Sequence, residues 1–107
     1  MNVRRMADVL PDLVVSFLRE GKTVRFVANG LSMQPVINDG ETIVVEPVVK
    51  LRRGEIYVYE KGDGIIVHRL IRIDGDRLTF RGERAIDNDP PVARDRVIGR
   101  VVTVKRT

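Results

Sequence analysis

Few side chains in this sequence could form a nucleophilic catalytic site. The 107 residues include one histidine, His68, two serines, Ser16 and Ser32, and no cysteine. Chemistry that needs an imidazole must therefore use His68, and disulfides and thiolate metal ligands are excluded. One histidine with carboxylates would also make an unusual zinc site. We therefore expect no metal and no cofactor.

Ser32 and His68 belong to the residue types that serve as nucleophile and general base. A nucleophilic serine needs a base within hydrogen-bonding distance, and a third group that orients the base improves it. Ser32 lies in a loop containing Gly and Pro, whereas His68 lies in a predicted strand. Asp87 and Asp89 lie in a second loop, residues 82–91, which is dense in charge. Such loops are often functional, but spacing alone does not bring these groups together, and a lone serine in a turn is more often structural.

One helix precedes the elements that would position these residues. Apolar residues at helical spacing predict an amphipathic helix over residues 8–20. Asp8 is its expected N-cap and Pro11 falls in its first turn, where a missing N–H is tolerated. Gly21 ends it. The apolar face expected to pack on the core consists of Met6, Val9, Leu10, Leu13, Val14, Phe17 and Leu18.

The rest of the sequence has the pattern of strands. Apolar or alternating segments occur at residues 23–27, 42–46, 55–59, 64–73, 77–80 and 97–104. Asp74-Gly75 favours a hairpin turn, and turn residues recur about every ten positions, as in a small coiled sheet or barrel. The sequence therefore predicts a mostly β single domain, in which an N-terminal helix, residues 1–21, packs on a β domain of residues 22–107.

Charge and hydropathy exclude several classes of protein. The formal net charge is +4, but acidic residues are scattered among the basic ones, so a mixed-charge surface is expected. A basic nucleic-acid-binding barrel would explain the charge, yet three Phe, two Tyr and no Trp offer few stacking platforms. Residues 1–21 are too short for a helix-turn-helix, so we expect no direct DNA binding. No segment approaches the about 20 apolar residues of a membrane span, and Asp8, Pro11 and Asp12 interrupt any signal-peptide core. We expect a cytoplasmic protein, with peripheral membrane association left open.

Four segments, in order, resemble the motif blocks of the signal peptidase and LexA-like serine peptidases. Residues 30–41 (GLSMQPVINDGE) resemble the Ser-Met-x-Pro block, and residues 51–59 resemble the Gly-Asp and strand block that follows it. Residues 67–71 (VHRLI) resemble the general-base block, with the His of the endoplasmic-reticulum and archaeal type where bacterial enzymes usually have Lys. Residues 80–89 and 97–101 resemble the last block, a Lys-Gly-Asp-Asn-Asn motif with a downstream Asp and an aliphatic-Gly-Arg-Val strand.

This resemblance covers about residues 22–104 and implies a LexA- and signal-peptidase-like β fold. It implies that Ser32 is the nucleophile and His68 the general base of a serine endopeptidase that cleaves a peptide or protein precursor. It places Asp89 as the acid that completes the triad, with Asp87 as the alternative. Neutral His68 would accept the Ser32 proton and return it to the leaving amine. Because histidine ordinarily titrates near pH 6.5, activity is expected to rise with pH through that titration.

The resemblance also implies roles for residues around the site. An oxyanion hole would use the backbone N–H of Ser32, and Gly30 stands where some members supply a hydroxyl, so a second donor must come from elsewhere. Met33 would pack beneath the nucleophile and line the substrate site. Arg69 and Glu83 stand where the family often pairs Arg with Asp, which implies a buried ion pair between the histidine strand and the last loop.

A different interpretation is a catalytically silent LexA-like module that binds a peptide or regulates a partner. Either interpretation expects an extended peptide or protein segment to add to a sheet edge near Ser32, with hydrogen bonds to its main chain. Cleavage of a peptide by the chain, and its loss in a Ser32 variant, would separate the two. The sequence favours no particular oligomeric state.

Overall fold

The alternating apolar segments form one antiparallel sheet in the structure, a computed structural model that describes residues 6–106, with side chains from residue 11 onward. The elements, in chain order, are α1 (Met6–Arg19), β1 (Val24–Val27), β2 (Thr42–Pro47), β3 (Ile56–Lys61), β4 (Gly64–Asp74), β5 (Arg77–Arg81), β6 (Val92–Ala93), the 3-10 helix η1 (Arg94–Arg96) and β7 (Val97–Lys105). The predicted mostly β fold with an N-terminal helix is confirmed. The two-residue strand β6 was not predicted.

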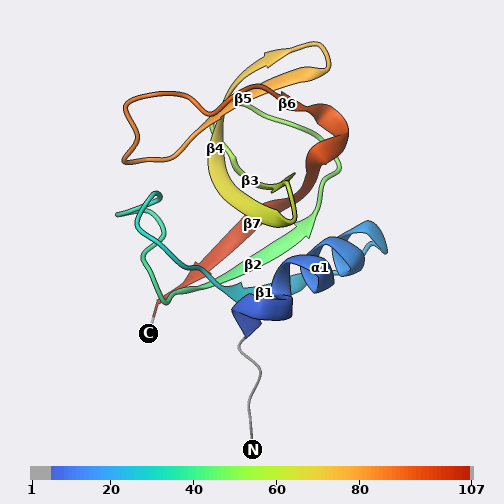
Figure 1. The fold of residues 1–107 in the computed structure, drawn as a ribbon, viewed down its shortest axis with the longest axis vertical. Helices are drawn as coiled ribbons and strands as arrows, with labels where there is room; N and C mark the ends of the chain where they lie inside the picture. The colour runs from blue at the N-terminus through green and yellow to red at the C-terminus, as the bar shows by residue number, and fades with distance from the viewer. Residues whose placement is uncertain (1–5, 107) are drawn as a thin grey trace, which may run out of the picture.

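The strand order places an element from late in the sequence in the interior of the sheet. The order is β1-β2-β7-β3-β4-β5-β6, so β7 joins the β1–β2 pair to the remaining strands. Figure 1 shows the sheet coiling strongly, with α1 beside β1 and β2. The register shifts within β2–β7, β3–β7 and β4–β5, and such irregularities increase local twist. Coiling brings the loop before β2 close to β4, which carries His68.

Helix α1 begins earlier than the sequence predicted. Since it starts at Met6, Asp8 lies inside the helix and is not its N-cap, and Pro11 lies beyond the first turn. Proline inside a helix removes one intrahelical hydrogen bond. Gly21 ends the helix as predicted, with φ +84° and its N–H 3.0 Å from the carbonyl oxygen of Leu18.

The buried face of α1 is narrower than the predicted one. Val14 and Leu18 are buried in a cluster with residues of β1, β2 and β7. Leu13 and Phe17, which the periodicity placed on the same face, are exposed, because the sheet contacts the side of the helix centred on Val14. The side chains of Met6, Val9 and Leu10 lie outside the described part of the structure. Among residues 6–106, no helix has the length and apolar character needed to cross a membrane.

Close packing of α1 on the sheet depends on Gly99 in β7. A Cβ added at Gly99 would overlap Val45 and lie 2.9 Å from Leu18 Cδ1. Both of these side chains are buried. Because Gly99 has no side chain, the helix can approach the sheet closely at this position. A second buried cluster contains Tyr57, Tyr59, Leu70, Leu78, Phe80, Val92 and Val97.

Candidate active site

Ser32 lies in a loop that is held by its own hydrogen bonds. We call residues 28–41 the Ser32 loop. The N–H of Gly40 donates to the carbonyl oxygen of Ala28 (2.8 Å), which closes the base of the loop. The N–H of Gly30 donates to Asp39 Oδ1 (2.7 Å). This bond occupies the Gly30 N–H, and Gly30 has φ +96°, a conformation that favours glycine.

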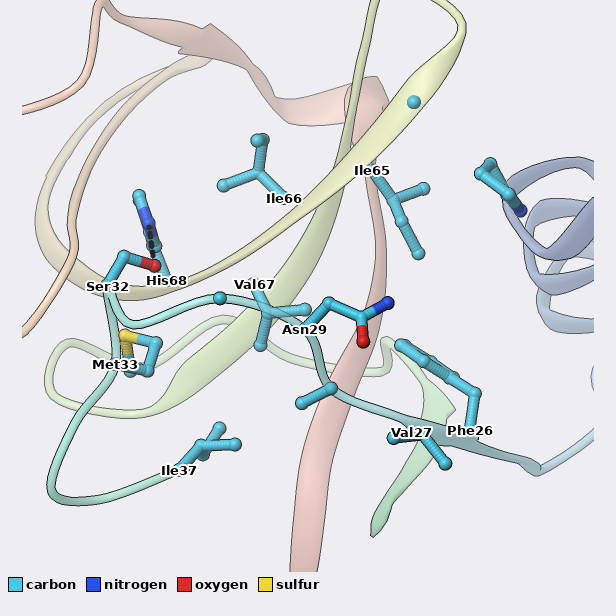
Figure 2. Close-up of a pocket in the computed structure, with 14 residues that line it drawn as sticks. Phe26, Val27, Asn29, Ser32, Met33, Ile37, Ile65, Ile66, Val67 and His68 are labelled. Carbon is cyan, nitrogen blue, oxygen red and sulfur yellow. Dashed lines mark hydrogen bonds between the residues drawn. The ribbon is translucent and has the colours of Figure 1, made fainter. Parts of the chain in front are cut away.

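Buried anchors fix the loop beneath Ser32. Met33 and Ile37 are buried, and the Ile37 N–H donates to the carbonyl oxygen of Met33 (2.9 Å). Figure 2 shows both side chains on the loop below Ser32. At the end of the loop, Glu41 pairs with Arg106 (2.6 Å) and its other oxygen accepts the N–H of Asn38 (2.6 Å). The backbone N–H of Asn38, followed by Arg106, lowers the pKa of Glu41, so this carboxylate stays charged.

The Ser32 hydroxyl faces His68 of β4. Ser32 Oγ lies 3.1 Å from His68 Nε2, and Figure 2 shows the two side chains pointing toward each other. The β3–β4 hairpin sets the position of His68, because pairing places it opposite Tyr57. Ser32 is exposed, whereas the His68 side chain is 13% exposed. The hydroxyl is therefore open to a substrate while the imidazole is held in the protein.

Asp89 completes a row of three side chains. His68 Nδ1 lies 2.6 Å from Asp89 Oδ2, and the Asp89 side chain is 17% exposed. Because a carboxylate accepts hydrogen bonds, this contact places the imidazole proton on Nδ1 and leaves Nε2 to accept the Ser32 proton. The Asp89 N–H donates to the carbonyl oxygen of Phe80 (2.7 Å), which anchors the acid to β5. Asp87, the alternative acid, is exposed.

Tyr59 contacts the same carboxylate and was missed by the sequence reasoning. Its hydroxyl donates to Asp89 Oδ2 at 2.6 Å. Burial raises the pKa of Tyr59 well above its ordinary value, and the hydrogen bond and charge of Asp89 raise it further. One signal was available: alternation from Tyr57 places Tyr59 on the face of β3 that His68 shares in the hairpin.

Glycine at position 82 allows the two loops to meet. A Cβ at Gly82 would lie 2.9 Å from the Ser32 carbonyl oxygen and 3.0 Å from His68 Nε2. That carbonyl oxygen accepts the Arg84 N–H at 3.0 Å, and Arg84 Nη1 donates to Gln34 Oε1 at 2.8 Å. The loop that carries Asp89 thus directly supports the loop that carries Ser32.

Arg69 and Glu83 form an ion pair between β4 and this second loop. Arg69 Nε donates to Glu83 Oε1 at 3.0 Å, and its guanidinium also donates to the Gly54 carbonyl oxygen. The Arg69 hydrogen bond lowers the pKa of Glu83. The ion pair is present as expected between the histidine strand and the last loop, and its side chains, 29% and 23% exposed, are partly rather than fully buried.

An apolar cavity of about 310 Å³ adjoins Ser32 and His68. Figure 2 shows Ile65 and Val67 of β4, with Phe26 of β1, around it. Met33 and Gly30 line the end nearest Ser32. The cavity could receive an apolar side chain next to the hydroxyl. Within residues 6–106, no group of three or more His, Cys, Asp or Glu side chains could hold a metal ion.

Comparison with known proteins identifies the family. The family model described as Peptidase S24-like matches residues 4–102, so the chain belongs to the Peptidase S24-like family. The resemblance predicted from the motif blocks is thereby confirmed. The chain is also similar to proteins named inactive signal peptidase IA from Staphylococcus aureus strains Mu50 and N315, with 27% identity over 88 residues in each case. The match covers 78% of this chain and 51% of each relative, so the chain spans about half the length of these curated relatives.

Proposed function

We propose that this protein is a serine endopeptidase that cleaves a peptide or protein precursor. The observation that carries the proposal is the continuous row from Ser32 Oγ through the His68 ring to Asp89 Oδ2, with contacts of 3.1 and 2.6 Å. Nucleophile, base and orienting acid stand in the order that acyl transfer requires. Membership of the Peptidase S24-like family supports the same activity.

The proposed reaction is acyl transfer through Ser32. Ser32 Oγ attacks the carbonyl carbon of the scissile peptide bond while His68 Nε2 takes the hydroxyl proton. The imidazolium then gives this proton to the leaving amine as the C–N bond breaks. Water attacks the resulting ester, His68 takes its proton, and that proton returns to Ser32 Oγ. Asp89 holds the tautomer and stabilises the imidazolium.

The backbone N–H of Ser32 is the proposed oxyanion donor. Among residues 6–106 this N–H meets no protein acceptor, so it is free to bind a developing oxyanion. The Gly30 N–H is already bonded to Asp39, and Gly30 offers no hydroxyl. Gly30 therefore contributes space beside the cavity, and the second donor must come from another group.

The substrate is proposed to bind as an extended strand. Within the described residues, β1 forms one edge of the sheet, next to the apolar cavity. A peptide added at this edge would gain main-chain hydrogen bonds and place one side chain in the cavity. The walls, which include Phe26 and Val67, favour an apolar residue near the scissile bond.

A silent peptide-binding module is the second candidate. The observation that favours it is the similarity to the relatives from Staphylococcus aureus, which are named inactive signal peptidase IA. Such a module would bind the same extended peptide without breaking it. The preassembled row of Ser32, His68 and Asp89 favours the peptidase in this chain.

The two candidates are separated by a peptide panel that varies the residues before the cut site. The parent chain is expected to cleave a subset with small or apolar residues, and Ser32→Ala is expected to lower kcat/KM by about 10³-fold or more. Mass spectrometry would locate the cut, and fluorescence anisotropy would report binding. Equal cleavage by Ser32→Ala and the parent would exclude Ser32 as nucleophile. Binding by both chains without cleavage would establish the silent module.

A further inference from the structure

Tyr59 has surroundings that a purely space-filling aromatic residue does not need. Its side chain is buried and its ring stacks on Phe80, with centroids 4.8 Å apart and planes 29° apart. The hydroxyl end reaches Asp89 Oδ2 at 2.6 Å, the same oxygen that contacts His68 Nδ1. One carboxylate oxygen therefore accepts two hydrogen bonds from two strands.

We infer that Tyr59 is a positioning residue for the His68–Asp89 pair, which fixes the Asp89 carboxylate and shares its charge. This inference rests on the proposed peptidase function. The stacked ring leaves the phenol little freedom, so its hydroxyl defines where Oδ2 must lie. The Asp89 N–H bond to Phe80 fixes the backbone of the same residue. Tyr59 and Phe80 thus hold the acid from its side chain and its main chain.

Sharing the carboxylate has a chemical consequence for His68. A hydrogen bond from Tyr59 draws charge away from Oδ2, so less of that charge is available to stabilise the imidazolium. Removing the phenol hydroxyl should make protonation of His68 easier and leave the carboxylate less constrained. The charged side chains around the second loop have partners other than His68: Arg69 pairs with Glu83, Arg81 contacts Asn88 and Arg84 contacts Gln34. Asp89 is the carboxylate that contacts Nδ1, and Tyr59 donates to the same carboxylate oxygen.

Tyr57 provides a matched control on the same strand. It is buried and contacts Phe80 edge-on, with centroids 6.4 Å apart. Its hydroxyl lies 3.1 Å from Glu55 Oε2 and accepts the Arg52 N–H at 2.8 Å, away from Asp89. Tyr57→Phe therefore removes a buried phenol hydroxyl without touching the row.

The presence of one histidine makes the test direct, because its ring protons give one set of NMR titration signals. In Tyr59→Phe the midpoint of the His68 titration is expected to move to higher pH by about half a unit or more, while Tyr57→Phe leaves it where the parent has it. With an active parent, kcat/KM on the plateau is expected to fall about tenfold in Tyr59→Phe only. An unmoved midpoint in folded Tyr59→Phe would overturn the inference and leave a structural role.

Two further measurements keep the test decisive. Repeating Tyr59→Phe on an Asp89→Asn background should abolish its effect on the midpoint, because the effect passes through the carboxylate. If Tyr59→Phe does not fold, 3-fluorotyrosine in the Tyr57→Phe chain replaces Tyr59 alone with a stronger donor, since the sequence has two tyrosines. The midpoint should then move to lower pH, and a midpoint that stays or rises contradicts the inference. A parent that cleaves no peptide refutes the peptidase proposal, while the titrations still report on Tyr59.

Discussion

Ser32 is exposed whereas His68 and Asp89 are mostly enclosed, and this difference suits the part that each would take in acyl transfer. An exposed hydroxyl can meet a peptide carbonyl. An enclosed carboxylate interacts more strongly with an imidazolium, because surrounding protein screens charge less than water does. The base and the acid are therefore largely buried, and the nucleophile stays accessible.

At the residue scale, the two aspartates of the second loop should differ sharply. Asp89→Asn is expected to lower kcat/KM by about 10³–10⁴-fold, because an amide at this position no longer favours the tautomer with a free Nε2. The kcat/KM of Asp87→Asn should stay within about twofold of that of the parent, since Asp87 is exposed and Asp89 is the residue that contacts His68 Nδ1. Steady-state cleavage assays of both variants test this. Equal losses would contradict the geometry, and a larger loss for Asp87→Asn would restore it as the acid.

The sequence identified the residues of the row through motif order, which depends on a few side chains with distinctive chemistry. It missed Tyr59 and the space at Gly82 for a physical reason. An aromatic residue in an apolar strand has the same pattern whether or not its hydroxyl meets a carboxylate. A glycine in a charged loop gives no sign that the Ser32 loop and His68 of β4 will lie within contact distance of it.

At the element scale, the fit of α1 on the sheet should depend on Gly99. Gly99→Ala is expected to lower the free energy of unfolding by about 1–3 kcal/mol, because its Cβ would overlap Val45 and press on Leu18. Gly64→Ala is the control, since its Cβ would make an ordinary contact at 3.7 Å from the Lys61 carbonyl oxygen. Urea unfolding of both variants measures the difference. A Gly99→Ala chain as stable as Gly64→Ala would show that helix and sheet adjust freely.

Local pattern predicted most elements, and the exceptions have identifiable causes. Strands β1 to β5 and β7 follow from apolar alternation, but β6 is too short to show a period. Asp8 and Pro11 predicted a later helix start because both residue types favour the first turn of a helix, whereas here they lie inside the helix Met6–Arg19. The order of strands could not be read from local pattern, because the neighbours of β7 lie far away in the sequence.

At the scale of the whole molecule, two carboxylates should make the folded protein less stable as the pH becomes acidic. Hydrogen bonds from Asn38 and Arg69, respectively, lower the pKa of Glu41 and Glu83 in the folded state. The unfolded chain therefore takes up protons on these groups at higher pH than the folded chain does. The contribution of these two groups to the free energy of unfolding should be fully present above about pH 5. It should decrease as the pH falls through about 4.5, the ordinary pKa of Glu, toward the lowered pKa values of the folded state.

Urea unfolding at a series of pH values checks this dependence, with Glu41→Gln as the test variant. The variant should show a shallower decrease between about pH 5 and pH 3 than the parent does. Glu46→Gln, at an exposed carboxylate of β2, should keep the parent's slope. A Glu41→Gln chain with the parent's slope would mean that Glu41 does not contribute.

The interior position of β7 also sets an order of events in time. The Ser32 loop lies between β1 and β2, His68 lies in β4, and β7 is the strand that joins these two parts of the sheet. A ribosome makes Ser32 and His68 well before it makes residues 97–105. A nascent chain therefore carries both side chains before the sheet that aligns them is complete. Under the proposed function, the peptidase stays idle during its own synthesis and gains its activity when β7 enters the sheet.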